Sequence, residues 1–128
     1  MKFKKILVAV AVLFVAAAAL LFANYDKAKV VSVMRENRTL VGKVQEALKT
    51  SDFAAAETSF KRFAEINDSI KEFTPTKGTK EEWSKVIVNF VTAAKKGAEA
   101  SAAKDSAKAA EALAQLLAYN KEGHTKFR

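Results

Sequence analysis

Two side chains of this chain could bind a metal ion from opposite sides. His124 is the only histidine, and Met34 is the only methionine besides Met1. Met34 begins a series of apolar residues at intervals of seven, and His124 ends another, so each is expected on the apolar face of a helix. A neutral imidazole and a thioether are the usual axial ligands of a six-coordinate haem iron. The same residues also suit an ordinary core methionine and a solvated histidine near a chain end.

The composition excludes most other site chemistry. The 128 residues include no cysteine, which excludes disulfides, thiolate catalysis, zinc–sulfur sites and thioether-linked haem. A single histidine also excludes sites that need several histidines. We find no catalytic triad, no carboxylate pair at a suggestive spacing and no phosphate-binding glycine loop. The chain is therefore not expected to be an enzyme.

Residues 1–23 are typical of a signal peptide. Three lysines precede Ile6, and an unbroken apolar run of 18 residues then extends to Ala23. Cleavage after Ala23 would leave a domain of residues 24–128, exported to a bacterial periplasm. The alternative is an uncleaved anchor in the inner membrane, because 18 residues is close to the minimum that spans a bilayer.

The net charge is +8, and removal of Lys2, Lys4 and Lys5 would leave 19 basic against 14 acidic residues, or +5. A basic exported domain could meet an acidic protein or an anionic lipid, although a solvated lysine-rich surface explains the charge as well. Nucleic acid is not an expected partner, because the compartment lacks it and no aromatic and basic recognition motif is visible. A membrane is expected only if the N-terminal segment stays uncleaved.

The remaining sequence has the periodicity of four amphipathic helices, over residues 26–49, 52–73, 79–104 and 105–128. Asp52 is a good N-cap, Thr79 and Glu82 match a capping box, and Asp105 or Ser101 could cap the last helix. No stretch alternates with the period of a strand. The expected inward residues recur at intervals of three and four: Val30, Met34, Asn37, Val41, Val44 and Leu48; Phe53, Ala56, Phe60, Phe63 and Ile70; Trp83, Val86, Ile87, Phe90, Val91, Ala94 and Ala98; and Ala110, Leu113, Leu117, His124 and Phe127.

We therefore expect an all-α fold, an antiparallel up-down-up-down four-helix bundle. This topology gathers bulky residues at one end, namely Met34, Phe73, Trp83, His124 and Phe127. The other end is rich in small residues: Ala93, Ala94, Gly97, Ala98, Ala102, Ala103, Ala107, Ala109 and Ala110. Small residues let helices approach closely, so that end is expected to be tight. The bulky end could hold a flat ligand.

The C-terminal residues 120–128 resemble the end of the cytochrome c-prime proteins, which reads Cys-Lys-x-Cys-His-x-x-Phe-Arg. Lys121, His124, Phe127 and Arg128 match this pattern, whereas Asn120 and Gly123 stand where the family has its two cysteines. The resemblance continues in residues 42–49 and in residues 73–83, where a loop with proline precedes a tryptophan.

This resemblance implies a four-helix bundle that binds haem. Without the cysteines no covalent haem c can form, so haem b would be held noncovalently. The soluble four-helix-bundle cytochrome b of the periplasm is similar, and its end reads His-x-Lys-Tyr-Arg. By this resemblance His124 is the proximal ligand, Met34 the sixth ligand, and Phe127 and Arg128 complete the cofactor-binding set, with Arg128 near a propionate.

Two alternatives stay open at this point. If Met34 only fills the core, the iron would be five-coordinate, as in cytochrome c-prime, and could bind small gases. If haem has been lost, the bundle would act as a protein-interaction or structural module. The resemblance also implies a redox partner protein for the haem form and a homodimer through the first helix.

Overall fold

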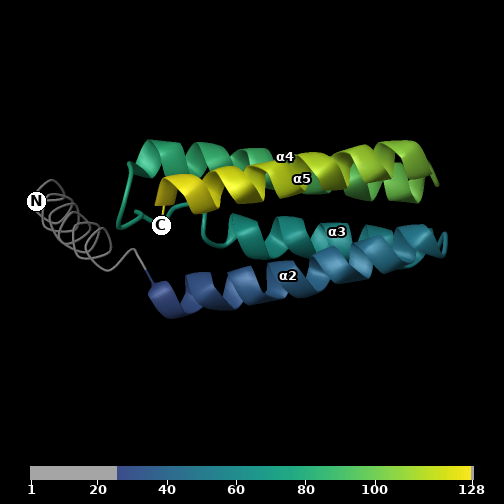
Figure 1. The fold of residues 1–128 in the computed structure, drawn as a ribbon, viewed down its shortest axis with the longest axis horizontal. Coiled ribbons are helices and arrows are strands. Elements are labelled where there is room, and N and C mark those ends of the chain that lie inside the picture. The colour runs from purple at the N-terminus through teal and green to yellow at the C-terminus, as the bar shows by residue number, and fades with distance from the viewer. Residues whose placement is uncertain (1–25, 128) are drawn as a thin grey trace, which may run out of the picture.

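The computed structural model describes residues 26–127, and these form four α-helices without a strand. The helices are α2 (Lys27–Lys49), α3 (Phe53–Asp68), α4 (Lys80–Ala102) and α5 (Ser106–Phe127). They lie side by side along one long axis (Figure 1). The predicted all-α four-helix bundle is confirmed. The predicted signal peptide or anchor and Arg128 lie outside the described residues.

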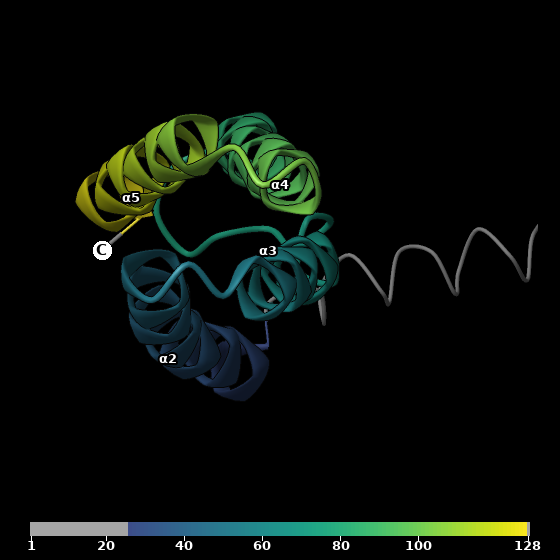
Figure 2. The same cartoon turned by 90° about the vertical axis from the view of Figure 1, so that its right-hand side faces the viewer.

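The four helices surround a common interior, as the end view shows (Figure 2). The turns between α2 and α3 and between α4 and α5 lie at one end of the bundle (Figure 1). Residues 69–79, the long connection between α3 and α4, lie at the other end, together with the start of α2 and the end of α5. We call the second of these the loop end. None of these four helices combines the length and the apolar character that a membrane crossing requires.

The predicted N-caps account for where the helices begin. Asp52 accepts a hydrogen bond from the Ala55 amide at 3.1 Å, and the Thr79 hydroxyl accepts one from the Glu82 amide at 3.1 Å. Asp105 does the same for Lys108 at 3.1 Å. The alternative cap Ser101 is wrong, because this residue is buried within α4. Each cap satisfies one of the amides that the first helical turn leaves without a backbone partner.

The two short turns have the same conformation. Ser51 and Lys104 each have φ of 56°, the left-handed region. In the first turn the Asp52 amide donates to the Ala47 carbonyl at 2.7 Å, and in the second the Asp105 amide donates to the Ala100 carbonyl at 2.8 Å. This is the Schellman arrangement that ends many helices. An aspartate in each turn therefore both closes one helix and opens the next.

The two helical hairpins also share one register. α2 and α4 are both 23 residues long. Every buried position of α2 corresponds to a buried position of α4 when Lys27 is aligned with Lys80: Val30 with Trp83, Val33 with Val86, Asn37 with Phe90, Leu40 with Ala93, Val44 with Gly97, and Ala47 with Ala100. The first helices of the two hairpins thus bury corresponding positions with different side chains.

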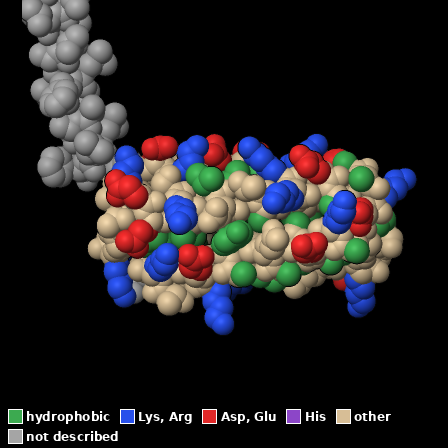
Figure 3. Space-filling view, turned by 90° about the horizontal axis from the view of Figure 1, so that it is seen from above, with side chains coloured by type: hydrophobic (Ala, Val, Ile, Leu, Met, Phe, Trp, Pro, Cys, Tyr) green, Lys and Arg blue, Asp and Glu red, His purple; other side chains and the backbone are tan. Residues whose placement is uncertain are grey.

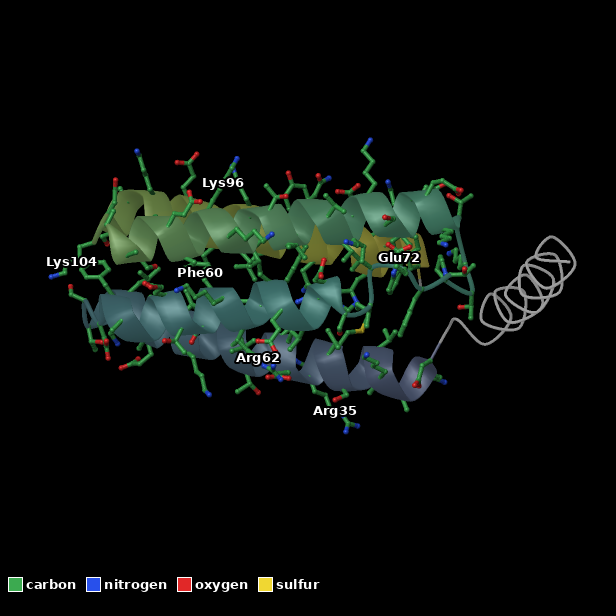
Figure 4. The ribbon with its side chains drawn as sticks, turned by 180° about the vertical axis from the view of Figure 1, so that it is seen from behind. Arg35, Phe60, Arg62, Glu72, Lys96 and Lys104 are labelled. Carbon is green, nitrogen blue, oxygen red and sulfur yellow. The ribbon has the colours of Figure 1, made fainter. Side chains whose placement is uncertain are left out.

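The core is centred on α3 and α4. Phe60 and Phe63 are fully buried, and Phe63 meets Phe90 edge to face with ring centroids 5.7 Å apart. Phe60 lies between the two helix layers (Figure 4) and faces Gly97, where an added Cβ would overlap the phenyl ring. A side chain at position 97 would therefore force α3 and α4 apart. The Phe60 ring thus packs directly on the backbone of α4 at Gly97.

Only part of the predicted small-residue end is buried. Five of its members are buried: Ala93, Ala94, Gly97, Ala98 and Ala109. The other four are exposed: Ala102, Ala103, Ala107 and Ala110. The exposed residues lie at the end of α4, in the turn that follows it and in the first turns of α5.

The inward face of α5 differs from the prediction. Leu116 is 1% exposed, whereas Leu117 is 36% exposed and Ala110 is also exposed. The buried residues of α5 are Ala109, Ala112, Leu113 and Leu116. α5 packs closely on α4 and contacts α2 far less. The helix is therefore rotated toward α4, and the predicted row of Ala110 and Leu117 lies at its margin.

The predicted second helix ends five residues earlier than expected, at Asp68 instead of residue 73. Beyond Asp68 the backbone bonds change to the tighter i to i+3 pattern, as between the Ile70 amide and the Asn67 carbonyl at 3.1 Å. The Ile70 carbonyl accepts the indole N–H of Trp83 at 2.7 Å. The same carbonyl also accepts the Phe73 amide at 3.2 Å, so it takes part in both a tight turn and a tertiary contact. Ile70 remains buried, as predicted.

The surface of the described residues mixes both signs of charge. On the face formed by α4 and α5, Lys and Arg side chains alternate with Asp and Glu, and hydrophobic atoms show between them (Figure 3). Across the outside of α2 and α3, Arg62 Nε donates to Glu36 Oε1 at 2.6 Å, and its Nη1 donates to Glu65 at 2.9 Å (Figure 4). The hydrogen bond to Glu36 raises the pKa of Arg62 above its ordinary value. These exposed pairs orient α2 on α3 without adding much stability.

Candidate functional site

A cavity of about 300 Å³ lies between the helices at the loop end. Its wall comes from the first turns of α2 and α4, the last turns of α3 and α5, and residues of the connecting loop. The apolar lining residues are Val30, Val31, Met34, Ile70, Pro75, Trp83, Val86, Ile87, Phe90 and Phe127. The weak contact between α2 and α5 leaves this space open, because two helices that part cannot fill the volume between them.

The structure places His124 and Met34 on the wall of this one cavity. Met34 extends from α2 and packs partly buried against the core. His124 extends from the last turn of α5; its side chain is half-buried, and its Nδ1 atom is shielded from solvent. The two predicted ligands, some ninety residues apart in the chain, are therefore brought to one site. The prediction that His124 faces inward rested on its seven-residue spacing from Leu117. Leu117 is exposed, so this spacing does not mark a continuous buried row.

The other predicted site residues are distributed differently. Phe127 lines the cavity, and its ring meets Trp83 edge to face with centroids 5.2 Å apart. Phe73, expected at the same end, does not line it and lies instead under the Lys29 ammonium, 5.8 Å from the ring centre. Gly123 and Asn120, which stand at the cysteine positions of the resemblance, both line the cavity.

One polar group on the wall was missed from the sequence. Asn67 at the end of α3 is 2% exposed and pairs with Asn37 of α2, which is 8% exposed. Asn67 Nδ2 donates to Asn37 Oδ1 at 2.7 Å and to the Phe63 carbonyl at 2.8 Å, and Asn37 Nδ2 donates to Asn67 Oδ1 at 3.1 Å. Its spacing could have indicated that Asn67 is buried, because Asn67 falls between Phe63 and Ile70 on the apolar face of the helix.

The Asn37–Asn67 pair is expected to contribute to the stability of the fold. Asn37→Ala removes two of the three hydrogen bonds of the buried Asn67 amide and is expected to lower the free energy of unfolding by about 1–3 kcal/mol. Asn37→Leu with Asn67→Leu removes both amides together, and its loss is expected to be smaller than the sum of the two single losses. Urea unfolding with a constant slope checks this. Strictly additive losses would show that the two amides do not depend on each other.

The arrangement offers two metal ligands of a particular kind. An imidazole on α5 and a thioether on α2 border one largely apolar space, and aromatic rings of Trp83, Phe90 and Phe127 contribute to its wall. Among the residues that the structure describes, no group of three or more His, Asp or Glu side chains could hold a metal ion.

Comparison of the chain with protein-family models, with curated proteins and with solved structures finds no match. The cavity and its two candidate ligands are therefore the features from which a function can be argued.

Proposed function

We propose that this chain is an exported electron-transfer protein that holds haem b noncovalently through His124 and Met34. The observation that carries the proposal is that a single cavity is lined by both of these residues and otherwise mostly by apolar side chains. An imidazole and a thioether are the ligand pair that cytochromes use to raise the potential of a six-coordinate iron.

The residues present fit such a group in donor chemistry and in polarity. His124 supplies a nitrogen donor and Met34 a soft sulfur donor, and they come from different helices of the cavity wall. The cavity volume of about 300 Å³ is at the lower end of ligand sites, and the space is partly open to solvent. An open site of this size would leave one edge of a macrocycle in water, which suits the charged propionates of haem.

The proposal assigns a role to several residues of the cavity wall. His124 and Met34 bind the iron, Trp83 and Phe90 exclude water from its apolar side, and the Asn37–Asn67 pair keeps buried amides satisfied beside it. Bound haem supplies a reversible one-electron change at its iron. Arg128 would pair with a propionate, and Asn120 and Gly123 leave the attachment noncovalent.

The proposed location and partners of the protein rest on the sequence of residues 1–23 and on the resemblance described above. With residues 1–23 as a cleaved signal peptide the haem domain would work in the periplasm, and as an uncleaved anchor at the inner membrane. It would exchange electrons with a redox partner protein, and a homodimer through α2 would follow the resemblance.

A visible spectrum of the purified domain, titrated with haemin and then reduced, tests the proposal. We expect a sharpened Soret band that saturates at one haem per chain, and resolved α and β bands after reduction. A Soret band without resolved α and β bands would leave one protein ligand and gas-binding chemistry. Absence of saturable binding would rule out the haem proposal and favour the haem-free interaction module.

A further inference from the structure

In the last turns of α5, the side chains that pack against the core, Tyr119 and Phe127, are only partly buried. The buried side chains of this helix end at Leu116, and the residues that follow on its inner side, Tyr119, Asn120, Gly123 and His124, face the cavity. A helix end that borders a cavity has few packing partners, and such ends fray readily. The position of His124 therefore depends on whatever holds the terminal turn.

An aromatic contact holds that turn. The Phe127 ring, one turn beyond His124, meets the indole of Trp83 edge to face at 5.2 Å and 69°. Trp83 is 3% exposed, and its Nε1 donates to the Ile70 carbonyl at 2.7 Å. The indole is thus anchored both to the start of α4 and to the chain that leaves α3, so it offers Phe127 a rigid surface.

Gly78 lies against the Phe127 ring and, with the Trp83 indole, forms the site in which this ring packs. Its φ of +85° is in the left-handed region, and an added Cβ would lie 2.9 and 3.1 Å from two atoms of the Phe127 ring. Both the backbone conformation and the space therefore favour glycine here. Gly78 does not line the cavity, so a change at this position does not alter the wall directly.

We propose that Gly78, Trp83 and Phe127 form a clamp that positions the last turn of α5 and thereby keeps His124 on the cavity wall. The clamp itself is argued from the contacts of the Phe127 ring with Trp83 and Gly78. Its consequence for ligand binding rests on the proposed function. Gly78 is in this sense a positioning residue, since it acts on His124 only through the packing of Phe127.

Hydrogen exchange of the haem-free protein tests the clamp, with three glycine variants. In Gly78→Ala we expect the amides of residues 121–127 to exchange at least about tenfold faster, and the emission of Trp83, the only tryptophan, to shift to the red. Gly78→Asn tolerates the left-handed backbone but keeps the Cβ, so it is expected to behave like Gly78→Ala. Gly42→Ala is the matched control, because nothing lies within 4 Å of its added Cβ.

Phe127→Leu tests the same clamp from its other side and leaves the loop backbone unchanged, so the proposal stays testable if Gly78→Ala fails to fold. Wild-type exchange in Phe127→Leu, or in a folded Gly78→Ala, would overturn the clamp. Wild-type exchange in Gly78→Asn alone would also overturn it, since backbone strain and not the ring contact would then be the cause.

Haemin titration of the same variants tests the consequence for His124. Gly78→Ala is expected to bind haemin at least about tenfold more weakly than Gly42→Ala, with the same band positions at saturation, because both ligands are still present. If wild type takes up no haemin, the proposed function fails while the exchange data still decide the clamp. If exchange accelerates but haemin affinity is unchanged, the clamp does not position His124 and this inference is wrong.

Discussion

His124→Ala is expected to abolish saturable uptake of haemin by the folded domain. On the proposed function His124 supplies the proximal nitrogen, and the chain contains no second histidine that could replace it. Apolar contact with the cavity wall alone would leave only weak, non-saturating binding. The measurement is a Soret titration of His124→Ala beside wild type, with circular dichroism to show that both are equally helical.

The control is Thr125→Ala, the next residue of α5. Thr125 is exposed, and its hydroxyl donates only to the Lys121 carbonyl one turn before it, at 3.0 Å, so haemin binding should stay at the wild-type level. Free imidazole added to His124→Ala is expected to restore part of the binding, because it can occupy the space that the side chain leaves.

Met34→Ala separates the two ligands. It is expected to leave a high-spin, five-coordinate haem bound through His124, without resolved α and β bands on reduction. Met34→Leu keeps the apolar volume and should give the same spectrum with less loss of stability. Unchanged spectra in both His124→Ala and Met34→Ala would remove the ligand assignment.

Gly97→Ala is expected to destabilise the bundle, although alanine has a higher helix propensity than glycine. The added methyl group would overlap the ring of Phe60, which is fully buried. Overpacking of this kind costs about 1–3 kcal/mol. By contrast, Gly42→Ala adds its methyl group where nothing lies within 4 Å, and should stabilise by about 0.5–1 kcal/mol.

The two variants make the same chemical change in two helices of equal length, so their difference isolates the contact with Phe60. Thermal unfolding should place their midpoints roughly 10 °C apart, with Gly97→Ala the lower. Gly97→Ala combined with Phe60→Leu is expected to recover part of the loss, since the smaller side chain makes room. Equal midpoints for Gly97→Ala and Gly42→Ala would show that α3 and α4 do not need glycine at their crossing.

Much of the local structure could be predicted from residue types. Asp52, Thr79 and Asp105 cap helices as expected, because a side-chain oxygen next to free amides acts within one turn of its own residue. Every residue that was predicted to face inward on α4, from Trp83 to Ala98, is also buried. This helix is buried broadly between α3 and α5, so a small rotation leaves the same residues inside.

Predictions failed where a neighbouring helix decides the outcome. Ala110 and Leu117 form as regular an apolar row as Ala109 and Leu116, and periodicity alone does not choose between them. The choice follows from how α5 lies against α4 and away from α2. Local periodicity likewise did not show that α3 ends at Asp68, or that the Ile70 carbonyl beyond this end accepts a hydrogen bond from the distant Trp83 indole.

From its sequence alone, this protein is determined to be a set of capped amphipathic helices without cysteine, with one histidine and one internal methionine as candidate ligands. These properties depend on residue identity and on interactions within a few residues of the chain. The tertiary structure alone decided that His124 and Met34 border one cavity, that Asn67 pairs with Asn37 there, and that Gly78 supports Phe127. Contacts between distant segments depend on helix crossing and rotation, which no local pattern specifies.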